Sequence, residues 1–211
     1  MASRATRSAS RAARLTEAVA TGPLGALSHD ELGVVFDGLA DPLQPVVAVA
    51  LSSTCLGLRT PLRAALEVLK AQHESAAALC RKVGMRWPDL REAKTLDWGW
   101  KCLTAADLAT LGMLLPKCSS LTSLQLDNNK IFDEGAKALA AGVAASGSLT
   151  TLDLAANNIG DEGAKALAAG VAASGSLATL YLININNNNG DNAKKSLRDA
   201  VHGRQGFDLV M

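Results

Sequence analysis

The chain has 211 residues, of which 48% are apolar and only 3% aromatic, and its formal net charge is +1. This composition is typical of a folded globular protein with an aliphatic core, and the balanced charge gives no general attraction to nucleic acid or anionic lipid. The longest apolar run, Val46 to Leu51, is far short of the roughly 20 residues that a membrane helix needs. We therefore expect neither a nucleic-acid nor a membrane partner.

The first 22 residues form an arm that is rich in arginine, serine and alanine, with no acidic residue before Glu17. Such a composition is typical of a disordered, solvated segment. It is also typical of an organelle transit peptide, which is rich in arginine and serine and poor in acids. A third interpretation is an interaction or phosphorylation segment around Ser8 and Ser10.

A helical segment is predicted for residues 23–90. Its first helix starts with an S-x-x-E capping box formed by Ser28 and Glu31, after which apolar residues recur at helical spacing. A second helix starts at Asp41–Pro42, where proline suits the first helical position. A third helix is predicted over residues 60–84, which end in a glycine.

The first part of this segment resembles an F-box, a short helical module. The matching letters are "DEL" at Asp30–Leu32, "DPL" at Asp41–Leu43 and "SSTCLGLR" at Ser52–Arg59, although Ser28 stands where an F-box usually has proline. The resemblance implies docking onto the Skp-type adaptor of cullin ubiquitin ligases. The residues that would make this contact are Leu27, Leu32, Phe36, Leu39 and Leu43. The alternative is a helical cap that covers the open edge of the unit that follows.

From residue 93 onward the sequence repeats with a period of 28 residues. The segment "DEGAKALAAGVAASGSL" occupies residues 133–149 and returns unchanged at residues 161–177. Four copies align a column of leucines, which are Leu96, Leu124, Leu152 and Leu180. The segments "TSLQL" and "TTLDL" alternate apolar and polar residues, which predicts strands buried on one face. The alanine-rich segment that follows has apolar residues at helical spacing, so each unit predicts one strand and one helix.

The segments Leu121–Ile131 and Leu149–Ile159 fit the pattern L-x-x-L-x-L-x-x-N-x-I, which is the signature of leucine-rich repeats. A unit of this length with a helical second half is similar to the ribonuclease-inhibitor-like class. The resemblance implies an α/β solenoid over residues 91–202, a short horseshoe of about four strand–helix units with a parallel sheet. It also implies that Asn129 and Asn157 satisfy backbone groups where each strand turns toward its helix.

The ends of the repeated helices carry their own signals. Asp133 and Asp161 are expected to cap helix N-termini, and Gly147 and Gly175 are expected to end the helices and turn the chain back. The tail at residues 203–211 is expected to fold over the last unit, with its apolar residues covering that edge.

Cysteine usage and motif content exclude several classes of chemistry. The four cysteines lack C-x-x-C spacing and no signal-peptide core precedes them, so we expect buried, reduced thiols in a cytoplasmic or nuclear protein. The three histidines are scattered, so neither a metal site nor a cofactor is expected. Phosphate-loop, H-E-x-x-H, G-x-S-x-G and G-x-G-x-x-G motifs are absent, so the sequence does not predict an enzyme.

A binding surface is predicted on the concave face, where the outward residues of the strands vary while the helices repeat. The candidate residues are Thr95, Asp97, Trp100, Ser123, Gln125, Asp127, Thr151, Asp153, Thr179 and Tyr181. Trp100 and Tyr181 are the expected anchors, because aromatic residues dominate interface hot spots.

The sequence therefore predicts a monomeric, non-enzymatic protein-binding scaffold, and three functional classes stay open. The first is a substrate-recognition adaptor of a cullin ubiquitin ligase. The second is a general protein-interaction module, receptor-like, whose N-terminal helices are only a structural cap. The third is a regulator of a small GTPase, since such regulators share this repeat class.

Overall fold

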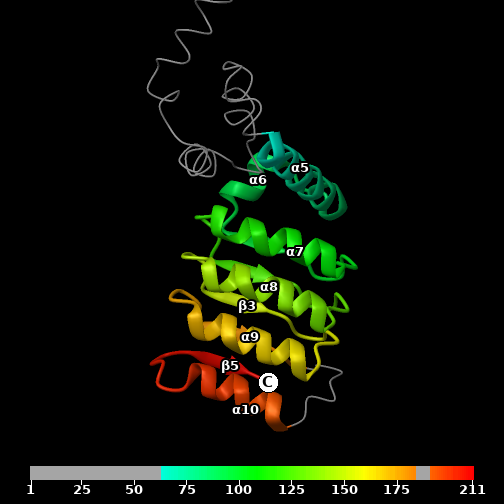
Figure 1. Cartoon of the computed structure of the whole chain (residues 1–211). Coiled ribbons are helices and arrows are strands. Elements are labelled where there is room, and N and C mark those ends of the chain that lie inside the picture. Colours follow the sequence, from blue (N-terminus) through cyan, green and yellow to red (C-terminus); the bar gives the residue numbers. More distant parts are fainter. Residues whose placement is uncertain (1–62, 184–190) are drawn as a thin grey trace, which may run out of the picture. The chain divides into compact units, whose positions relative to one another are not determined.

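Within residues 63–183 and 191–211, which the computed structural model describes, five short strands form one parallel sheet in sequence order (Figure 1). The strands are β1 Thr95–Asp97, β2 Ser123–Gln125, β3 Thr151–Asp153, β4 Thr179–Tyr181 and β5 Asp208–Val210. The predicted α/β solenoid with a parallel sheet is confirmed. The sheet has one strand more than the repeat pattern indicates, because the C-terminal tail contributes β5.

A helix follows each of the first four strands and packs against the helix of a neighbouring unit. These helices are α7 Ala105–Leu114, which continues into the 3₁₀ turn η1 Leu115–Lys117, α8 Asp133–Ala145, α9 Asp161–Ala173 and α10 Asp191–Val201. Figure 1 shows the four helices side by side on one side of the sheet. The opposite face of the sheet carries no helix in the described part of the chain.

Two helices precede the sheet. Helix α5 spans Arg63–Val83 and ends before Gly84, which has a positive φ of 75°, as its position after the predicted helix requires. The chain divides into the compact units Met1–Glu74 and Ser75–Met211, and the boundary falls inside α5. Helix α6, Trp87–Glu92, follows in the second unit. None of the described helices combines the length and the apolar content that crossing a bilayer requires.

The predicted column of leucines forms one interior row. The strand register pairs Leu96 with Leu124, Leu152 and Leu180 in turn, and each is at most 1% exposed. A second buried row lies two residues later and contains Trp98, Leu126, Leu154 and Leu182. Full burial of a leucine side chain contributes about 1.5–3 kcal/mol. Since one repeat alone cannot cover these residues, stacking of the units stabilises the fold.

The repeated helices pack closely because small residues line their contacts. A Cβ atom added to Gly142 of α8 would collide with the backbone of Gly112 in α7. A Cβ atom added to Gly170 of α9 would lie 2.5 Å from the carbonyl oxygen of Ala140. The alanine- and glycine-rich composition of the helices is therefore a requirement of their spacing.

The two predicted asparagines form a buried ladder under the loops that lead from strand to helix. Asn157 Oδ1 accepts hydrogen bonds from the backbone N–H groups of Asn129 and Ile131, both at 3.0 Å. Its Nδ2 donates to the carbonyls of Leu126, Leu154 and Ala155. Asn129 repeats the pattern one unit earlier, with donation to Trp98, Leu126 and Asp127 and acceptance from Leu103. The expected role of both side chains is confirmed.

The prediction that Asp133 caps its own helix is wrong. Asp133 is the first residue inside α8, and the N-cap residue, Phe132, makes no side-chain capping bond. Instead, Asp133 Oδ1 accepts hydrogen bonds from the N–H groups of Gly160 at 2.6 Å and Gly163 at 3.0 Å, at the start of α9. The Asp133 carboxylate thus points sideways to the start of the neighbouring helix and not back to the N-terminus of its own helix. Asp161 is likewise the first residue of α9, with Gly160 as its N-cap.

The helix ends also differ from the prediction. Helices α8 and α9 end at Ala145 and Ala173, with Ser146 and Ser174 as C-cap residues in extended conformation and the glycines directly after them. Neither Gly147 nor Gly175 adopts a positive φ. The buried serine hydroxyls accept hydrogen bonds from the backbone N–H three residues later, at 3.3 and 3.2 Å. The chain therefore turns through serine side chains rather than left-handed glycine.

The C-terminal tail covers the last repeat as expected, and it does so as a strand. Residues of β5 pair in parallel with β4, so that Leu209 continues the leucine row beside Leu180. The guanidinium of Arg204 holds the preceding turn by donating to the carbonyls of Val171, at 2.7 Å, and Leu177. This anchor was not predicted, because an exposed-looking arginine in a polar tail gives no sign of a partner about 30 residues away.

Candidate protein-binding face

The face of the sheet that points away from the helices is called the open face below. It consists of the first and third residues of each strand, because side chains alternate along a strand and the middle leucine points inward. Its members are Thr95, Asp97, Ser123, Gln125, Thr151, Asp153, Thr179, Tyr181, Asp208 and Val210. All of them are exposed or half-buried. The eight strand residues predicted for the concave face are therefore in two neighbouring rows of this surface.

The other two predicted residues, Trp100 and Asp127, lie in the loops that leave β1 and β2. Trp100 has a positive φ of 59°, and the equivalent residues of the next two units, Asn128 and Ala156, share this left-handed conformation. The Trp100 N–H donates to the Asp127 carbonyl at 3.1 Å. The backbone ladder thus continues past the strands and holds the indole outside, where Trp100 is 75% exposed. Asparagine is a usual residue for this conformation, whereas tryptophan and alanine give no such signal.

Two carboxylates of the site meet around a glycine. Asp97 Oδ1 accepts a hydrogen bond from the Gly99 N–H at 3.3 Å. From the neighbouring unit, the carboxylate of Asp127 leans over the same residue, since a Cβ atom on Gly99 would lie 2.7 Å from Asp127 Oδ1. Asn128 Nδ2 donates to the other oxygen of Asp127 at 2.9 Å. The missing side chain at Gly99 therefore leaves room for the Asp127 carboxylate beside the loop whose backbone Asp97 binds.

A third carboxylate continues the series on β3. Asp153 Oδ1 accepts a hydrogen bond from the Ala155 N–H at 2.8 Å. Burial raises the pKa of the Asp153 carboxyl, the nearby Asp127 carboxylate raises it further, and the hydrogen bond from Ala155 opposes both effects. None of Asp97, Asp127 and Asp153 forms an ion pair with a residue that the structure describes. The open face therefore carries negative charge without an internal counter-charge.

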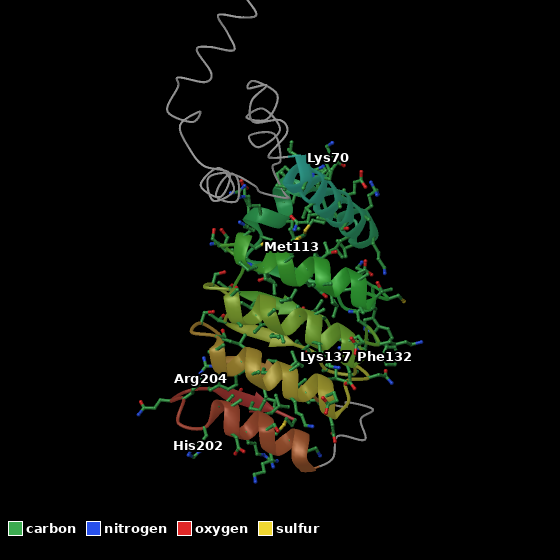
Figure 2. The ribbon with its side chains drawn as sticks, viewed as in Figure 1. Lys70, Met113, Phe132, Lys137, His202 and Arg204 are labelled. Carbon is green, nitrogen blue, oxygen red and sulfur yellow. The ribbon has the colours of Figure 1, made fainter. Side chains whose placement is uncertain are left out.

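The ion pairs of the repeats lie on the helices instead. On the outer surface of α8, Glu134 pairs with Lys137 at 3.1 Å, and Glu162 pairs with Lys165 on α9 at 2.8 Å. These pairs are solvent-exposed, and each links two residues of one helix. Figure 2 shows Lys137 at the same end of the helical layer as Phe132. The layer of helices α7 to α10 is called the helical wall below. The charges of Glu134 and Glu162 on this wall are balanced by lysines of the same helix, in contrast to the acidic residues of the open face.

Phe132 is an exposed aromatic residue that the sequence reading missed. It lies in the loop before α8, is 60% exposed, and takes the position that Gly160 has in the next unit. A shallow pocket of about 260 Å³ lies beside it, lined by Cys102, Leu103, Thr104, Ala105, Asn129, Lys130 and Phe132. The signal that was available is the break in the repeat, where an aromatic replaces a glycine.

The cysteines differ from one another more than expected. Cys80 and Cys118 are buried, and burial raises the pKa of the Cys80 thiol. The prediction of burial is wrong for Cys102, which is exposed because it follows Trp100 in the left-handed loop after β1, with a φ of 53°. Cys55 lies outside the described residues. Within residues 63–183 and 191–211, no cluster of three metal-ligating side chains occurs.

The adaptor-docking candidates are outside the part of the chain that the structure describes. They are Leu27, Leu32, Phe36, Leu39 and Leu43.

Comparison with known proteins agrees with the geometry of the repeats. The Leucine Rich repeat family model matches residues 117–140 and 146–168. These segments contain β2, β3 and the first turns of α8 and α9, so the match falls on the units with the regular leucine and asparagine positions. No curated protein matches the sequence significantly. The two matched units are leucine-rich repeats, a kind of unit that generally serves as a protein-interaction module.

Proposed function

We propose that this leucine-rich-repeat protein is a non-enzymatic, monomeric scaffold that binds a partner protein on its open face. The observation that carries the proposal is the contrast between wall and face. Residues 133–149 and 161–177 are identical and build α8 and α9. The open-face residues of the strands beside them differ, being Ser and Gln in β2, Thr and Asp in β3, and Thr and Tyr in β4. Identical residues suffice for stacking the repeats, whereas varied and accessible residues suit recognition of a partner protein.

The size of the face indicates how a partner would use it. Five parallel strands span four spacings of about 4.8 Å, so the face is about 20 Å wide. A stable interface takes about 800 Å² from each partner. We therefore expect a partner to contact the adjoining loops as well, where Trp100 and Phe132 are exposed.

Bulky, uncharged substitutions on the two sides of the molecule test this function. Ser123→Trp with Thr151→Trp places two indoles on the open face, while Ala141→Trp with Ala169→Trp places them on the exposed outer side of α8 and α9. Proteins that co-purify with each variant from cells are quantified by mass spectrometry. Loss of partners with the first pair and retention with the second is the expected result. Equal recovery by both pairs would contradict the proposal.

We also propose that the F-box-like residues dock a Skp-type adaptor, which would make the protein a substrate-recognition adaptor of a cullin ubiquitin ligase. The support is the sequence alone, in the segments Asp30–Leu32, Asp41–Leu43 and Ser52–Arg59. A pull-down with the purified adaptor compares the wild-type chain with a Leu32→Asp, Phe36→Asp double variant. Equal recovery of the adaptor by both chains would leave the alternative, a general interaction module, receptor-like or a small-GTPase regulator, with a structural N-terminal cap.

A further inference from the structure

We propose that the segment received by the open face is basic and presents an arginine between the Asp97, Asp127 and Asp153 carboxylates and the indole of Trp100. This inference rests on the proposed function, since it names the chemistry of the partner for the same surface. It is carried by the charge of the face, by the position of the exposed indole and by the contrast with the helical wall.

The charge of the open face has one sign. Its charged members are Asp97, Asp153 and Asp208, and Asp127 follows directly after β2. No lysine or arginine occupies any of the ten open-face positions of the described strands. The whole chain nevertheless has a net charge of +1, so the negative charge belongs to this face rather than to the protein in general.

The carboxylates are arranged so that a cation supplied by a partner would reduce the electrostatic repulsion between them. Asp97 and Asp127 both lie against Gly99, at 3.3 Å from its N–H and 2.7 Å from the position of an added Cβ atom respectively. Asp127 also opposes the ionisation of Asp153. The charges of Asp127 and Asp153 therefore disfavour one another, and a cation placed beside them is attracted to both.

The indole of Trp100 makes arginine the best match for that cation. Trp100 is 75% exposed, and its backbone N–H donates a hydrogen bond at 3.1 Å to the backbone carbonyl of Asp127. The backbone that carries the indole is thus tied to the residue that carries one of the carboxylates. A guanidinium group can bind a carboxylate through two N–H groups and stack on an aromatic ring, whereas an ammonium group acts as a point charge. Tryptophan is also the best aromatic partner for a cation.

The acids of the helical wall offer an internal comparison. Glu134 and Glu162 each have a lysine of the same helix within 3.1 Å. A basic peptide would have to displace these lysines, so the wall should attract it weakly. Neutralising acids on the wall is therefore a matched control for neutralising acids on the open face.

The test uses the full chain and a fluorescein-labelled peptide of Gly-Ser-Arg triplets, with Gly-Ser-Lys and Gly-Ser-Glu peptides for comparison, read by fluorescence anisotropy at low ionic strength. The open-face variant is Asp97→Asn, Asp127→Asn, Asp153→Asn. The wall variant is Glu134→Gln, Glu162→Gln, Asp199→Asn, which changes the net charge equally and alters three exposed residues. We expect the open-face variant to weaken binding of the arginine peptide about tenfold or more, and the wall variant less than about twofold.

Two further measurements keep the result clear of folding defects. Trp100→Ala changes an exposed side chain and should weaken the arginine peptide more than the lysine peptide, because stacking favours the planar group. Circular dichroism and thermal unfolding check each variant. Equal weakening by the open-face and wall variants, no weakening by either, or equal binding of the glutamate peptide would overturn the inference.

The outcomes separate this inference from the function on which it rests. If cellular partners survive the open-face Asn variant but are lost with the Ser123→Trp, Thr151→Trp pair, the face binds a partner that is not basic. The inference then fails while the proposed function stands. If both variants retain the partners, the proposed function itself fails.

Discussion

Asp133 of one repeat accepts a hydrogen bond from the backbone N–H of Gly160, at 2.6 Å, where the helix of the next repeat begins. The same oxygen also accepts from Gly163, at 3.0 Å. Each helix start has backbone N–H groups without a partner in their own helix, and here a neighbour supplies the acceptor. At this junction capping is therefore a contact between units that couples their stabilities, whereas α7 is capped within its own unit by Thr104 and Asp107.

Removal of this acceptor should weaken the junction between the second and third units. We expect Asp133→Ala to lower the free energy of unfolding by about 1 kcal/mol, the usual cost of losing a capping side chain, and Asp133→Asn to lose less. Urea unfolding followed by circular dichroism measures the effect. Glu134→Ala is the control, since Glu134 is exposed and pairs only across the surface with Lys137. A loss for Glu134→Ala as large as for Asp133→Ala would speak against inter-repeat capping.

The buried asparagine ladder should contribute more than the cap. Asn157→Ala leaves the N–H groups of Asn129 and Ile131 without their acceptor in a buried site. An unsatisfied buried group costs about 1–3 kcal/mol, so we expect a loss of about 3 kcal/mol or more. The neighbouring Asn158 is half-buried, and Asn158→Ala should cost less than about 1 kcal/mol. Similar urea midpoints for the two variants would contradict the ladder as a stabilising element.

Two glycine-to-alanine substitutions test the close approach of the helices. Gly142→Ala pushes a methyl group into the backbone of Gly112 and should destabilise the protein by about 1–3 kcal/mol through overpacking. Gly147→Ala meets no atom within 4 Å and does not have a positive φ, so it should be neutral or slightly stabilising. Thermal unfolding of the two variants measures the difference. Equal midpoints would mean that the helices are further apart than described.

Arg204 should control the attachment of the C-terminal strand. Its guanidinium donates to Val171 and Leu177, and it lies 4.8 Å from the centre of the Phe207 ring. A lysine cannot make two such bonds in fixed geometry. We expect Arg204→Lys to speed hydrogen exchange of Leu182, whose N–H donates to the Val210 carbonyl of β5, while the β2 and β3 amides stay protected. Figure 2 shows Arg204 at the end of the helical layer opposite Phe132.

The control for this exchange experiment is Arg198→Lys, a substitution at an exposed residue of α10. It should leave the exchange of Leu182 unchanged. Uniformly faster exchange in both variants would show that the tail is not held by Arg204 in particular.

The open face should lower stability through Asp153. The pKa of this carboxyl lies above its usual value of 3.8 because burial and Asp127 disfavour the charge. A group whose pKa is raised by folding stabilises the fold below its unfolded-state pKa, and this contribution is lost as the pH rises through the folded value. We therefore expect Asp153→Asn to raise the urea midpoint near neutral pH, with little change below the usual value of 3.8.

The pKa of the Asp107 carboxyl is shifted in the opposite direction, below its usual value. Burial alone would raise its pKa, but the Lys82 ammonium at 2.5 Å and hydrogen bonds with Thr104 lower it overall. A lowered pKa contributes stability above the unfolded-state value, which is lost as the pH falls through the folded value. Asp107→Asn should therefore lower the urea midpoint near neutral pH and converge with the wild type in acid. Shifts of the same sign for Asp107→Asn and Asp153→Asn would contradict this assignment.

The sequence predicts well the features that recur in each repeat. The row through Leu124 and Leu152 and the ladder through Asn129 and Asn157 follow from a period that fixes which residues share an environment. Asp133 was assigned to the wrong helix because sequence separation cannot show that a side chain reaches sideways to the next unit. Trp100 lies in the loop after β1 and not among the strand residues of the open face, and its left-handed backbone is not predicted because only its stacked equivalents reveal the conformation.

Non-local anchors and charge balance could not be predicted. Arg204 binds carbonyls that are 33 and 27 residues away, and a tail of polar residues does not specify such partners. Asp97 and Asp127 form no ion pair with the described residues, and this depends on which cations lie near them in space, which requires the fold.

Removal of one complete unit tests the central claim most directly, that identical segments form an interchangeable wall and varied strands carry recognition. Deletion of residues 133–160 rejoins Phe132 to an identical copy of the sequence that it normally precedes, and it removes α8 and β3. We predict a folded chain with one cooperative urea transition of smaller slope, since less surface is exposed on unfolding, and weaker recovery of its partners because Thr151 and Asp153 are gone. A chain that shows no cooperative transition, or one that recovers its partners undiminished, would contradict the account.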